Sequence, residues 1–430
     1  MLDKYKYIKE KIMKILVIGS GAREHAICNA LIKNQKVKII YCATGNAGIE
    51  LMNNCKNVKI STIDEILNFA KKENIDLTIV GSEEMLVDGI VDKFQENNLK
   101  IFGPNKQAAM LEGSKSFSKS FMKKYGVKTA KYETFIDSNN ANEYLNKCNY
   151  PIVIKASGLA LGKGVIICNN KNEAKNAIED IMIKKIFNNA GNEVVIEEFL
   201  DGVEVSILSI TDGNIIIPFI SAKDHKKIGD NDTGNNTGGM GVISPNPYYT
   251  KENEELFIKD ILEPTLKGIK DEKMSFSGII FFGLMITKNG IYLLEYNMRM
   301  GDPETQAVLE LLDTDYLTII ESAMNRNLKN LNIKWKNKYA CCVVMASLGY
   351  PTRYNKGYKI TGIENINGKC FIAGAKLDEN KNIITDGGRV LNIVNIADSL
   401  EEARKLTYSD IEKVNFENKY YRKDIGFIKL

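Results

Sequence analysis

Glu295 and Asn297 are the side chains whose types and spacing point most directly to chemistry. They stand two positions apart at the end of an apolar run, and because side chains alternate faces along a strand, both would point the same way. A carboxylate and an amide oxygen on one face suit a hard cation such as Mg²⁺, which often shares its ligands with phosphates. Arg299 has the same parity, and its guanidinium suits an anionic substrate. An ordinary solvated strand end is the alternative, and the spacing alone leaves both open.

Lysine and glycine combine in a second candidate site upstream. Lys155 ends the apolar run 151–155, and the glycine-rich stretch 158–165, which contains Lys163, follows it. A Walker A loop would need Ser or Thr at position 164, which is glycine. A glycine-rich hairpin between two strands, entered from a lysine, instead favours a flap over nucleotide phosphates. The alternative is a plain hairpin turn.

Two further stretches have the composition of ligand-contacting segments. The strand that reaches Glu197 runs into a polar hinge whose backbone groups could read an adenine edge, and Glu204 could hold ribose hydroxyls. Taken singly, these acids are ordinary strand-end carboxylates. The polar stretch 224–241 carries five glycines, which let the backbone approach a ligand. We predict an irregular substrate loop there, because long structureless loops in compact chains tend to be functional or disordered.

The apolar runs predict the strands and helices that must position these side chains. Runs at 279–286 and 291–296 flank Asn289-Gly290, a pair suited to a type I′ turn, which predicts a β-hairpin that ends near Glu295. A single helix is predicted to begin at 111 and run to 124. Beyond 338, short apolar runs and a helix at 400–413 indicate a compact α+β region with no obvious reactive constellation.

Near the N-terminus, buried strands and helices alternate from residue 14 to residue 102, with glycine after several strands. This pattern predicts a parallel doubly wound sheet. The turn Gly19-Ser-Gly21 could bind phosphate through its peptide N–H groups. A dinucleotide fingerprint would need a third glycine at Glu24 and an acid after the second strand, where Tyr41-Cys42 stands. We therefore expect a sugar-phosphate or structural turn rather than an NAD site.

Composition narrows the functional class. The net charge is +4 and no dense basic run is present, which argues against nucleic acid as a partner. No apolar run reaches the roughly 18 residues of a membrane span, and the charged N-terminus lacks the apolar core of a secretory signal, so we expect a cytoplasmic protein. Eight cysteines without a CxxC pair indicate buried reduced thiols, and two histidines give little support to zinc or a Ser-His-Asp triad.

Eight motifs occur in an order that resembles one known family. They are VIGSGAREHA, TGNAG, IFGPNKQAAMLEGSK, PIVIKASGLALGKGV, VIEEFLDGVEVS, SAKDHKKIGDNDTGNNTGGMGVISP, LLEYNMRMGDPETQ and the C-terminal RKDIG. The chain resembles the glycinamide ribonucleotide synthetases (phosphoribosylamine–glycine ligases), ATP-grasp enzymes of de novo purine synthesis, over residues 14–430. The resemblance implies ligation of glycine to 5-phosphoribosylamine through glycyl phosphate, with conversion of ATP to ADP and phosphate.

The resemblance also implies a role for each matching residue. Glu295 and Asn297 would ligate Mg²⁺ or Mn²⁺, and Lys163, Asp224 and Arg299 would act at the reacting centre. ATP would be bound by Lys115, Lys155, Gly162, Gly164, Glu197, Glu198, Phe199, Leu200 and Glu204. Glycine and the phosphoribosyl group would be bound by Gly19, Gly21, Arg23, Asn46, Gly48, Lys226, Asn236, Thr237, Gly238, Gly239, Met240, Gly301, Asp302, Pro303 and Glu304.

The implied fold is multidomain, α/β and α+β. We expect an N-terminal extension at 1–13, with Met13 as an alternative start, and a doubly wound domain at 14–114. An ATP-grasp domain at 115–330 would contain a flap subdomain at about 126–198, and a small α+β domain would span 331–430. The expected partners are small molecules, with no nucleic acid or membrane, in a monomer or weak homodimer. The competing functions are another ATP-grasp ligase, an NAD-dependent oxidoreductase and a non-catalytic nucleotide-binding regulator.

Overall fold

The N-terminal region is a parallel sheet, as predicted, in a computed structural model that describes residues 12–160, 163–274 and 276–428. The strand order is β3-β2-β1-β4-β5. The sheet and its helices comprise β1 (Met13–Gly19), α1 (Ala22–Leu31), β2 (Val37–Thr44), α2 (Ala47–Glu50), β3 (Cys55–Asn57), α3 (Ile63–Glu73), β4 (Leu77–Val80), α4 (Glu83–Asp88), α5 (Ile90–Glu96) and β5 (Ile101–Phe102). The order reverses between β1 and β4, and in such sheets ligands bind beyond the carboxyl ends of the strands at this switch point.

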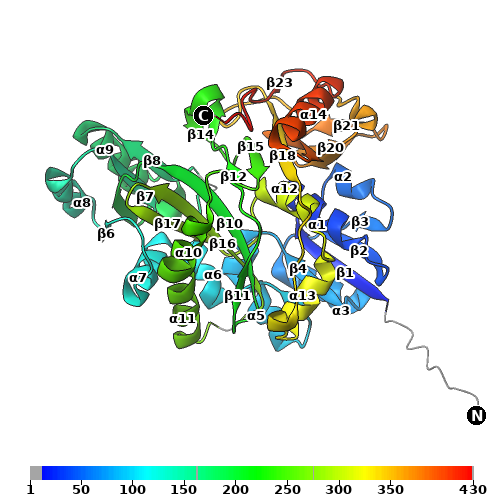
Figure 1. Ribbon diagram of the computed structural model, residues 1–430, viewed down its shortest axis with the longest axis horizontal. Helices are drawn as coiled ribbons and strands as arrows, with labels where there is room; N and C mark the ends of the chain where they lie inside the picture. The colour runs from blue at the N-terminus through cyan, green and yellow to red at the C-terminus, as the bar shows by residue number, and fades with distance from the viewer. Residues whose placement is uncertain (1–11, 161–162, 275, 429–430) are drawn as a thin grey trace, which may run out of the picture.

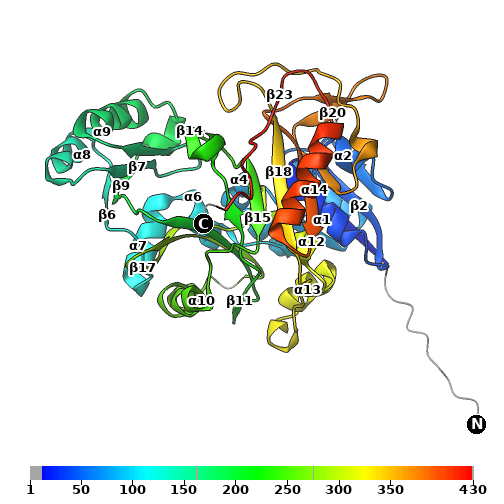
Figure 2. The same ribbon diagram turned by 45° about the horizontal axis from the view of Figure 1, so that its top comes forward.

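The central region contains two four-stranded antiparallel sheets (Figure 1). One sheet has the order β6-β9-β7-β8 and forms the lobe farthest from the N-terminal region in both views (Figures 1 and 2). It comprises β6 (Tyr132–Phe135), α8 (Ser138–Tyr144), β7 (Ile152–Ala156), β8 (Val165–Cys168), α9 (Lys171–Ile178) and β9 (Val194–Glu198). The other has the order β11-β10-β16-β17 and comprises β10 (Val203–Thr211), β11 (Ile216–Pro218), β16 (Gly278–Thr287) and β17 (Gly290–Asn297). The β16–β17 hairpin confirms the predicted pairing, but its two turn residues are Lys288 and Asn289, and of Asn289 and Gly290 only Gly290 has a positive φ (+108°), so the type I′ turn expected at Asn289-Gly290 does not form.

Helices α6 (Lys106–Gly113), α7 (Lys115–Tyr125), α10 (Lys251–Phe257) and α11 (Glu263–Asp271) pack against the second sheet around a core that includes Phe121, Phe257 and Phe282. The prediction of one helix from 111 to 124 was wrong, because Ser114 has an extended backbone between α6 and α7. Its hydroxyl accepts a hydrogen bond from the Phe117 N–H at 3.2 Å. Ser114 thus caps α7 and places Lys115 at the first helical position.

The C-terminal sheet includes strands from the predicted substrate loop. Its order is β12-β15-β18-β22-β19, with β23 beside β18. The elements are β12 (Lys223–Asp224), β15 (Gly241–Ser244), β18 (Tyr339–Ser347), β19 (Lys369–Ile372), β22 (Arg389–Ala397), α14 (Leu400–Lys413) and β23 (Lys419–Tyr420), with small hairpins β13 (Lys227–Gly229)–β14 (Thr233–Asn236) and β20 (Ala375–Leu377)–β21 (Ile383–Thr385). The stretch 224–241 is therefore not irregular throughout: buried Val242 and Ile243 pair with β18 and draw the chain into a sheet.

Helix α12 (Glu304–Leu311) joins the three regions. Every one of its residues is buried, and it packs against α1, β15, β18 and β22 (Figure 1). Helix α13 (Tyr316–Met324) follows after a break between Leu311 and Tyr316. One apolar cluster extends from β1 through α12 to β18. Across the described ranges, no helix is long and apolar enough to cross a membrane.

Candidate active site

A β-bulge decides which way Glu295 points. The β16–β17 register pairs Gly283 with Glu295 but Leu284 with Leu293, so Leu294 is an extra residue on β17. Strict alternation would have put Glu295 on the same face as buried Leu293. The bulge reverses the alternation, so Tyr296 is buried while Glu295 and Asn297 lie together on the partly exposed face. Sequence parity predicted the shared face but missed the bulge.

Lysines surround the Glu295 carboxylate. Burial by itself raises the pKa of Glu295, but Lys226, Lys155, Lys115 and Arg299 together lower it below its ordinary value. The group is therefore ionised at neutral pH. Lys155 is 6% exposed, and its Nζ lies 3.4 Å from the Leu294 carbonyl oxygen, directly beside the bulge.

Glu197 lies between two buried lysines. Its Oε2 is 3.0 Å from Lys155 Nζ, and its Oε1 is 3.2 Å from Lys119 Nζ. Lys119 also donates to Thr129 Oγ1 at 2.7 Å, and burial lowers its pKa to about 8 against the opposing effect of Glu197. Sequence reasoning missed Lys119, although it stands four residues after Lys115, on the same face of α7. The Glu197 side chain thus orients Lys155, and any adenine contact there would come from the backbone.

The oxygen pair Glu295 and Asn297 fits a divalent cation that arrives with phosphates. Asn297 Oδ1 accepts from Arg299 Nη2 at 3.3 Å, which fixes the direction of the amide. Among the described residues, no group of three His, Cys, Asp or Glu side chains could hold a metal ion. A cation at this pair would therefore need phosphate oxygens and water to complete its shell, as is usual for Mg²⁺.

Arg299 and Arg23 join β17 to the N-terminal region through two glutamates that the sequence did not reveal. Arg299 Nη2 is 2.8 Å from Glu112 Oε1, and Arg299 Nε is 3.5 Å from Glu83 Oε2. Arg23 Nη1 lies 3.9 Å from the same Glu83 oxygen and donates to the Met300 carbonyl at 3.2 Å. Both guanidiniums are thus oriented by protein carboxylates.

Carboxylates gather around Lys226. Asp224 is buried, and its Oδ1 has no hydrogen-bond partner in the described chain. Burial and then Glu304 raise the pKa of Asp224 well above its ordinary value, against Lys226. Burial also raises the pKa of Glu304, whose Oε1 accepts from Ser206 Oγ at 3.0 Å. Lys226 Nζ lies 3.0 Å from Glu204 Oε2, so the carboxylate predicted to hold ribose has a protein partner.

The segment 236–241 runs beside His225 and Lys226. The Thr237 and Met240 N–H groups donate to the Lys226 and His225 carbonyls, each at 2.8 Å. The Gly239 N–H donates to Thr237 Oγ1 at 2.9 Å. These bonds hold the backbone of Gly238 and Gly239 close to Asp224, which agrees with the glycine-rich pattern.

The N-terminal residues predicted to bind substrate make structural contacts at the carboxyl edge of their sheet. Asn46 accepts from the Gly48 N–H at 2.9 Å and donates to the carbonyls of Ser20 at 2.9 Å and Ile372 at 2.7 Å. A Cβ on Gly48 would lie 2.3 Å from His25. Gly19 and Gly21 lie at the β1–α1 turn. Asn46 therefore ties this turn to the C-terminal region.

The remaining predicted residues are those expected to bind ATP, around Glu198 and Lys163, and those expected to bind substrate, around Asn236 and Asp302. Glu198 Oε1 accepts from the Lys131 N–H at 2.9 Å, while Phe199 is 37% exposed and Leu200 partly exposed. Lys163 is exposed, its Nζ donates to the Pro351 carbonyl at 3.4 Å, and Gly164 is buried; Gly162 lies outside the described residues. Asn236 and Lys226 flank the substrate segment, and Gly301, Asp302 and Pro303 precede α12 beside Glu304. The chemical role of every predicted site residue stays a prediction.

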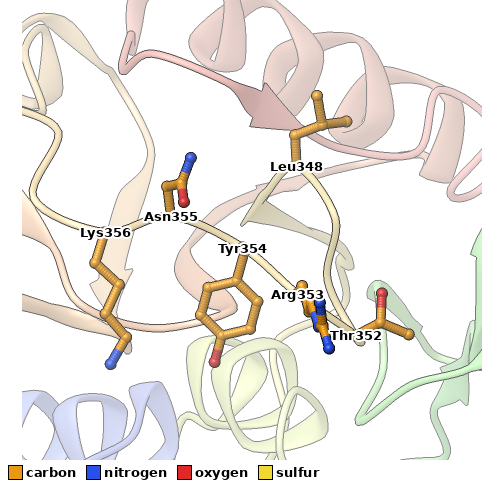
Figure 3. Close-up of a pocket in the computed structure, with 6 residues that line it drawn as sticks. All are labelled: Leu348, Thr352, Arg353, Tyr354, Asn355 and Lys356. Carbon is orange, nitrogen blue, oxygen red and sulfur yellow. The ribbon is translucent and has the colours of Figure 1, made fainter.

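The C-terminal region reaches the site, which the sequence did not predict. Arg389 at the start of β22 and Tyr350 after β18 contact Gly238. No local feature of the sequence marks either residue, because both bond to backbone groups of Gly238. Beside Tyr350, an open hollow of about 550 Å³ is lined by Leu348, Thr352, Arg353, Tyr354, Asn355 and Lys356 (Figure 3). None of these six residues was predicted to bind substrate.

Comparison with known proteins covers most of the chain. Models described as the N, ATP-grasp (A) and C domains of phosphoribosylglycinamide synthetase match residues 13–112, 113–305 and 340–428. The phosphoribosylamine–glycine ligase of Fusobacterium nucleatum is 62% identical over 96% of this chain and 98% of its own. That of Clostridium acetobutylicum is 57% identical over 96% and 99%.

Solved structures agree with the three-domain arrangement. The crystal structure of phosphoribosylamine–glycine ligase from Thermotoga maritima matches with a TM-score of 0.84 and 33% identity over 96% of this chain and 100% of that one. A biotin carboxylase domain from Hydrogenobacter thermophilus matches with a TM-score of 0.71 and 15% identity over 95% and 92%, a likeness of fold alone. The N-terminal parallel sheet, central ATP-grasp domain and C-terminal α+β domain are thus confirmed.

Proposed function

The chain belongs to the phosphoribosylglycinamide synthetase family, and from that premise we propose that it joins glycine to 5-phosphoribosylamine with conversion of ATP to ADP and phosphate. One observation carries the proposal to the residues: Lys226 interacts both with Glu295, which Lys155 and Lys115 also face, and with the carboxylates Glu204 and Asp224, so a lysine-rich half and a carboxylate-rich half of the site meet there. The lysine-rich half suits ATP, because its lysines are opposite in charge to the phosphates. The carboxylate-rich half suits an amine. The proposed setting is de novo purine synthesis.

The first step is attack of a glycine carboxylate oxygen on the γ-phosphorus of ATP, with ADP as the leaving group. Two anions must meet, so cationic groups have to neutralise charge as it develops. Lys115 and Lys155 have this role in our proposal, because both contribute to the positive field at Glu295. A Mg²⁺ or Mn²⁺ ion held by Glu295 and Asn297 would add positive charge and orient phosphate oxygens when bound.

The second step is attack of the phosphoribosylamine nitrogen on the carbonyl carbon of glycyl phosphate, with phosphate as the leaving group. The nitrogen loses a proton as the amide forms. Asp224 and Glu304 support this step, since burial raises the pKa of both carboxyl groups and so makes each a better proton acceptor. Asp224 Oδ1 is also free of protein partners in the described chain, so it can accept from an amine. No side chain need act as a covalent nucleophile.

Phosphate release tests the reaction directly. Purified protein with ATP and Mg²⁺ is expected to release phosphate only when glycine and freshly generated phosphoribosylamine are both present. Omission of either substrate gives the matched control. Release without glycine, or no release with the complete mixture, would contradict the proposal. A rival ATP-grasp ligase would respond to a different acceptor.

We also infer a monomer or weak homodimer in the cytoplasm. The support for the compartment is that the eight cysteines are all free, and five of them are buried, as expected of reduced thiols. Sedimentation velocity across a tenfold concentration range should show one dominant species. A stable higher oligomer would contradict this inference.

A further inference from the structure

Arg389 holds two segments of the carboxylate-rich half of the site through one nitrogen atom. Its Nη1 donates to the Gly238 carbonyl at 2.6 Å and to the Asp302 carbonyl at 2.9 Å. The same nitrogen lies 3.4 Å from Asp302 Oδ1. Since an arginine Nη carries two protons, the two short bonds use both of them. One side chain of the C-terminal sheet therefore fixes the 238–239 backbone relative to the turn before α12.

Tyr350 makes a second side-chain hydrogen bond to the Gly238 backbone. Its hydroxyl oxygen accepts from the Gly238 N–H at 3.0 Å. Both backbone polar groups of Gly238 are thus bonded to C-terminal side chains that are more than 100 positions away in sequence. Residues so distant constrain a loop only when the domains are assembled, so this contact links the placement of the C-terminal domain to the shape of the substrate segment.

The Gly238–Gly239 backbone lies against Asp224, which is proposed to contact the amine substrate. Gly239 has a φ of +108°, and a Cβ there would lie 2.7 Å from Asp224 Oδ1 and 2.5 Å from Pro303 Cδ. Asp224 and Pro303, the residue before Glu304, therefore stand immediately beside the segment that Arg389 and Tyr350 hold. A shift of this backbone would change its contacts with Asp224 and with the turn that leads to Glu304, and small misplacements of positioned groups are costly in catalysis.

We propose that Arg389, assisted by Tyr350, is a positioning residue for the glycine and phosphoribosylamine half of the site and has no role in ATP binding. The proposal rests on the proposed function. It assigns the C-terminal domain a specific task, which is to fix the Gly238–Gly239 backbone against Asp224 and the Asp302-Pro303 turn. Lysine at position 389 keeps the charge, but its ammonium is a point charge on a shorter, flexible stem and would not hold a nitrogen at the position of Arg389 Nη1, between the Gly238 and Asp302 carbonyls.

The experiment compares Arg389→Lys and Tyr350→Phe with Arg404→Lys in the full chain. Arg404 is a matched control, because it is also a C-terminal arginine that donates to two backbone carbonyls, those of Ile425 at 3.1 Å and Lys423 at 3.0 Å. The KM values for glycine and phosphoribosylamine are expected to rise about tenfold in Arg389→Lys, the effect of one lost charge-assisted bond. Tyr350→Phe should show a smaller rise, and the KM for ATP should stay unchanged in all three.

Amide hydrogen exchange gives a readout that does not depend on activity. Peptides covering 236–241 should exchange faster in Arg389→Lys and Tyr350→Phe than in the wild type or Arg404→Lys. Unchanged exchange would overturn the proposal, and so would faster exchange with unchanged acceptor KM values, since the contact would then only stabilise the loop. An inactive wild type would count against the ligase function instead, and exchange alone would then decide whether Arg389 holds this segment.

Discussion

The two halves of the site differ in charge and in the contacts that hold them. The lysine-rich half, proposed to bind ATP, is the lysine half, and the carboxylate-rich half, proposed to bind glycine and phosphoribosylamine, is the acceptor half. In the lysine half, Lys115, Lys119 and Lys155 face two carboxylates, Glu197 and Glu295. In the acceptor half, carboxylates predominate, and Asp224 and Glu304 have raised pKa values. The difference suits a reaction that brings together a polyphosphate and an amine. Each half complements the charge of the group it is proposed to receive, the polyphosphate in the first and the amine in the second.

The origin of the supporting contacts differs as well. The lysine half is built inside the central domain, where α7 packs near β9 and β17. The acceptor half collects Asp224 from β12, Glu304 from α12 and Arg389 from β22. The first half therefore depends on one domain, whereas the second depends on the assembly of the central and C-terminal regions. Substitutions in the two halves should have correspondingly different effects.

The largest effect is expected where the halves meet. Glu295→Gln removes the charge that the surrounding lysines and the proposed cation share, so kcat should fall by about a thousandfold. ATP should still bind, because Lys115 and Lys155 remain. Steady-state kinetics and calorimetric ATP binding would measure the two quantities.

Glu133→Gln provides a matched control for that substitution, since Glu133 is an exposed glutamate on β6, in the sheet with the order β6-β9-β7-β8. Its kcat should equal that of the wild type. Near-normal turnover of Glu295→Gln at ordinary Mg²⁺ would rule out the role given to Glu295.

Loss of stability should be greatest inside the lysine half. Glu197→Gln leaves Lys119 and Lys155 buried without their shared partner, and loss of one member of a buried ion pair costs about 3 kcal/mol of unfolding free energy. Lys163→Ala changes an exposed flap lysine and should leave stability unchanged while it lowers the rate. Urea unfolding would measure both, and equal stability of the two variants would contradict this account of the lysine half.

The acceptor half can be tested at Asp224. Asp224→Asn keeps the shape but removes the acid, so kcat/KM for phosphoribosylamine should fall by about tenfold to a hundredfold. The KM for ATP should stay the same, because the lysine half is untouched. A matched control is Asp201→Asn, an exposed aspartate in the turn before β10. A parallel rise in the KM for ATP would show that the two halves are not separable.

The smallest effect concerns pH. Burial lowers the pKa of His25 to about 4, and burial with Lys223 and Arg422 lowers that of His225 to about 3. Since the unfolded chain takes up these protons near pH 6.5, stability should fall as pH drops below that value, by about 1.4 kcal/mol per histidine at pH 5.5. NMR of the two imidazoles should show no titration between pH 8 and 5. A midpoint near 6.5 for either one would contradict this burial.

Sequence predicted the lysine half better because its parts lie on regular local elements. Apolar runs and Asn289-Gly290 gave the hairpin that carries Glu295, and the glycine-rich stretch gave β7 and β8 around Lys155. The bulge at Leu294 was missed, since one extra residue changes the register without changing the apolar pattern. The same limit applied at Ser114, where a cap divides a helix whose composition is continuous.

The acceptor half was predicted only in outline. The glycines of 224–241 indicated a substrate segment, but the short strands that place it depend on pairing with β18, about 100 residues later. Arg389 and Tyr350 carry no local signal of a role at the site, because their partners are backbone groups of Gly238. Contacts of this kind follow from domain assembly and cannot be read from spacing or periodicity.

Transfer of oxygen from glycine to phosphate tests the central claim most directly. Glycine labelled with ¹⁸O in both carboxylate oxygens would be incubated with the protein, ATP, Mg²⁺ and phosphoribosylamine, and the released phosphate analysed by mass spectrometry. If the glycine carboxylate attacks the γ-phosphorus in the lysine half and the amine displaces phosphate in the acceptor half, each phosphate carries one ¹⁸O and each amide keeps one. Unlabelled phosphate would contradict the account.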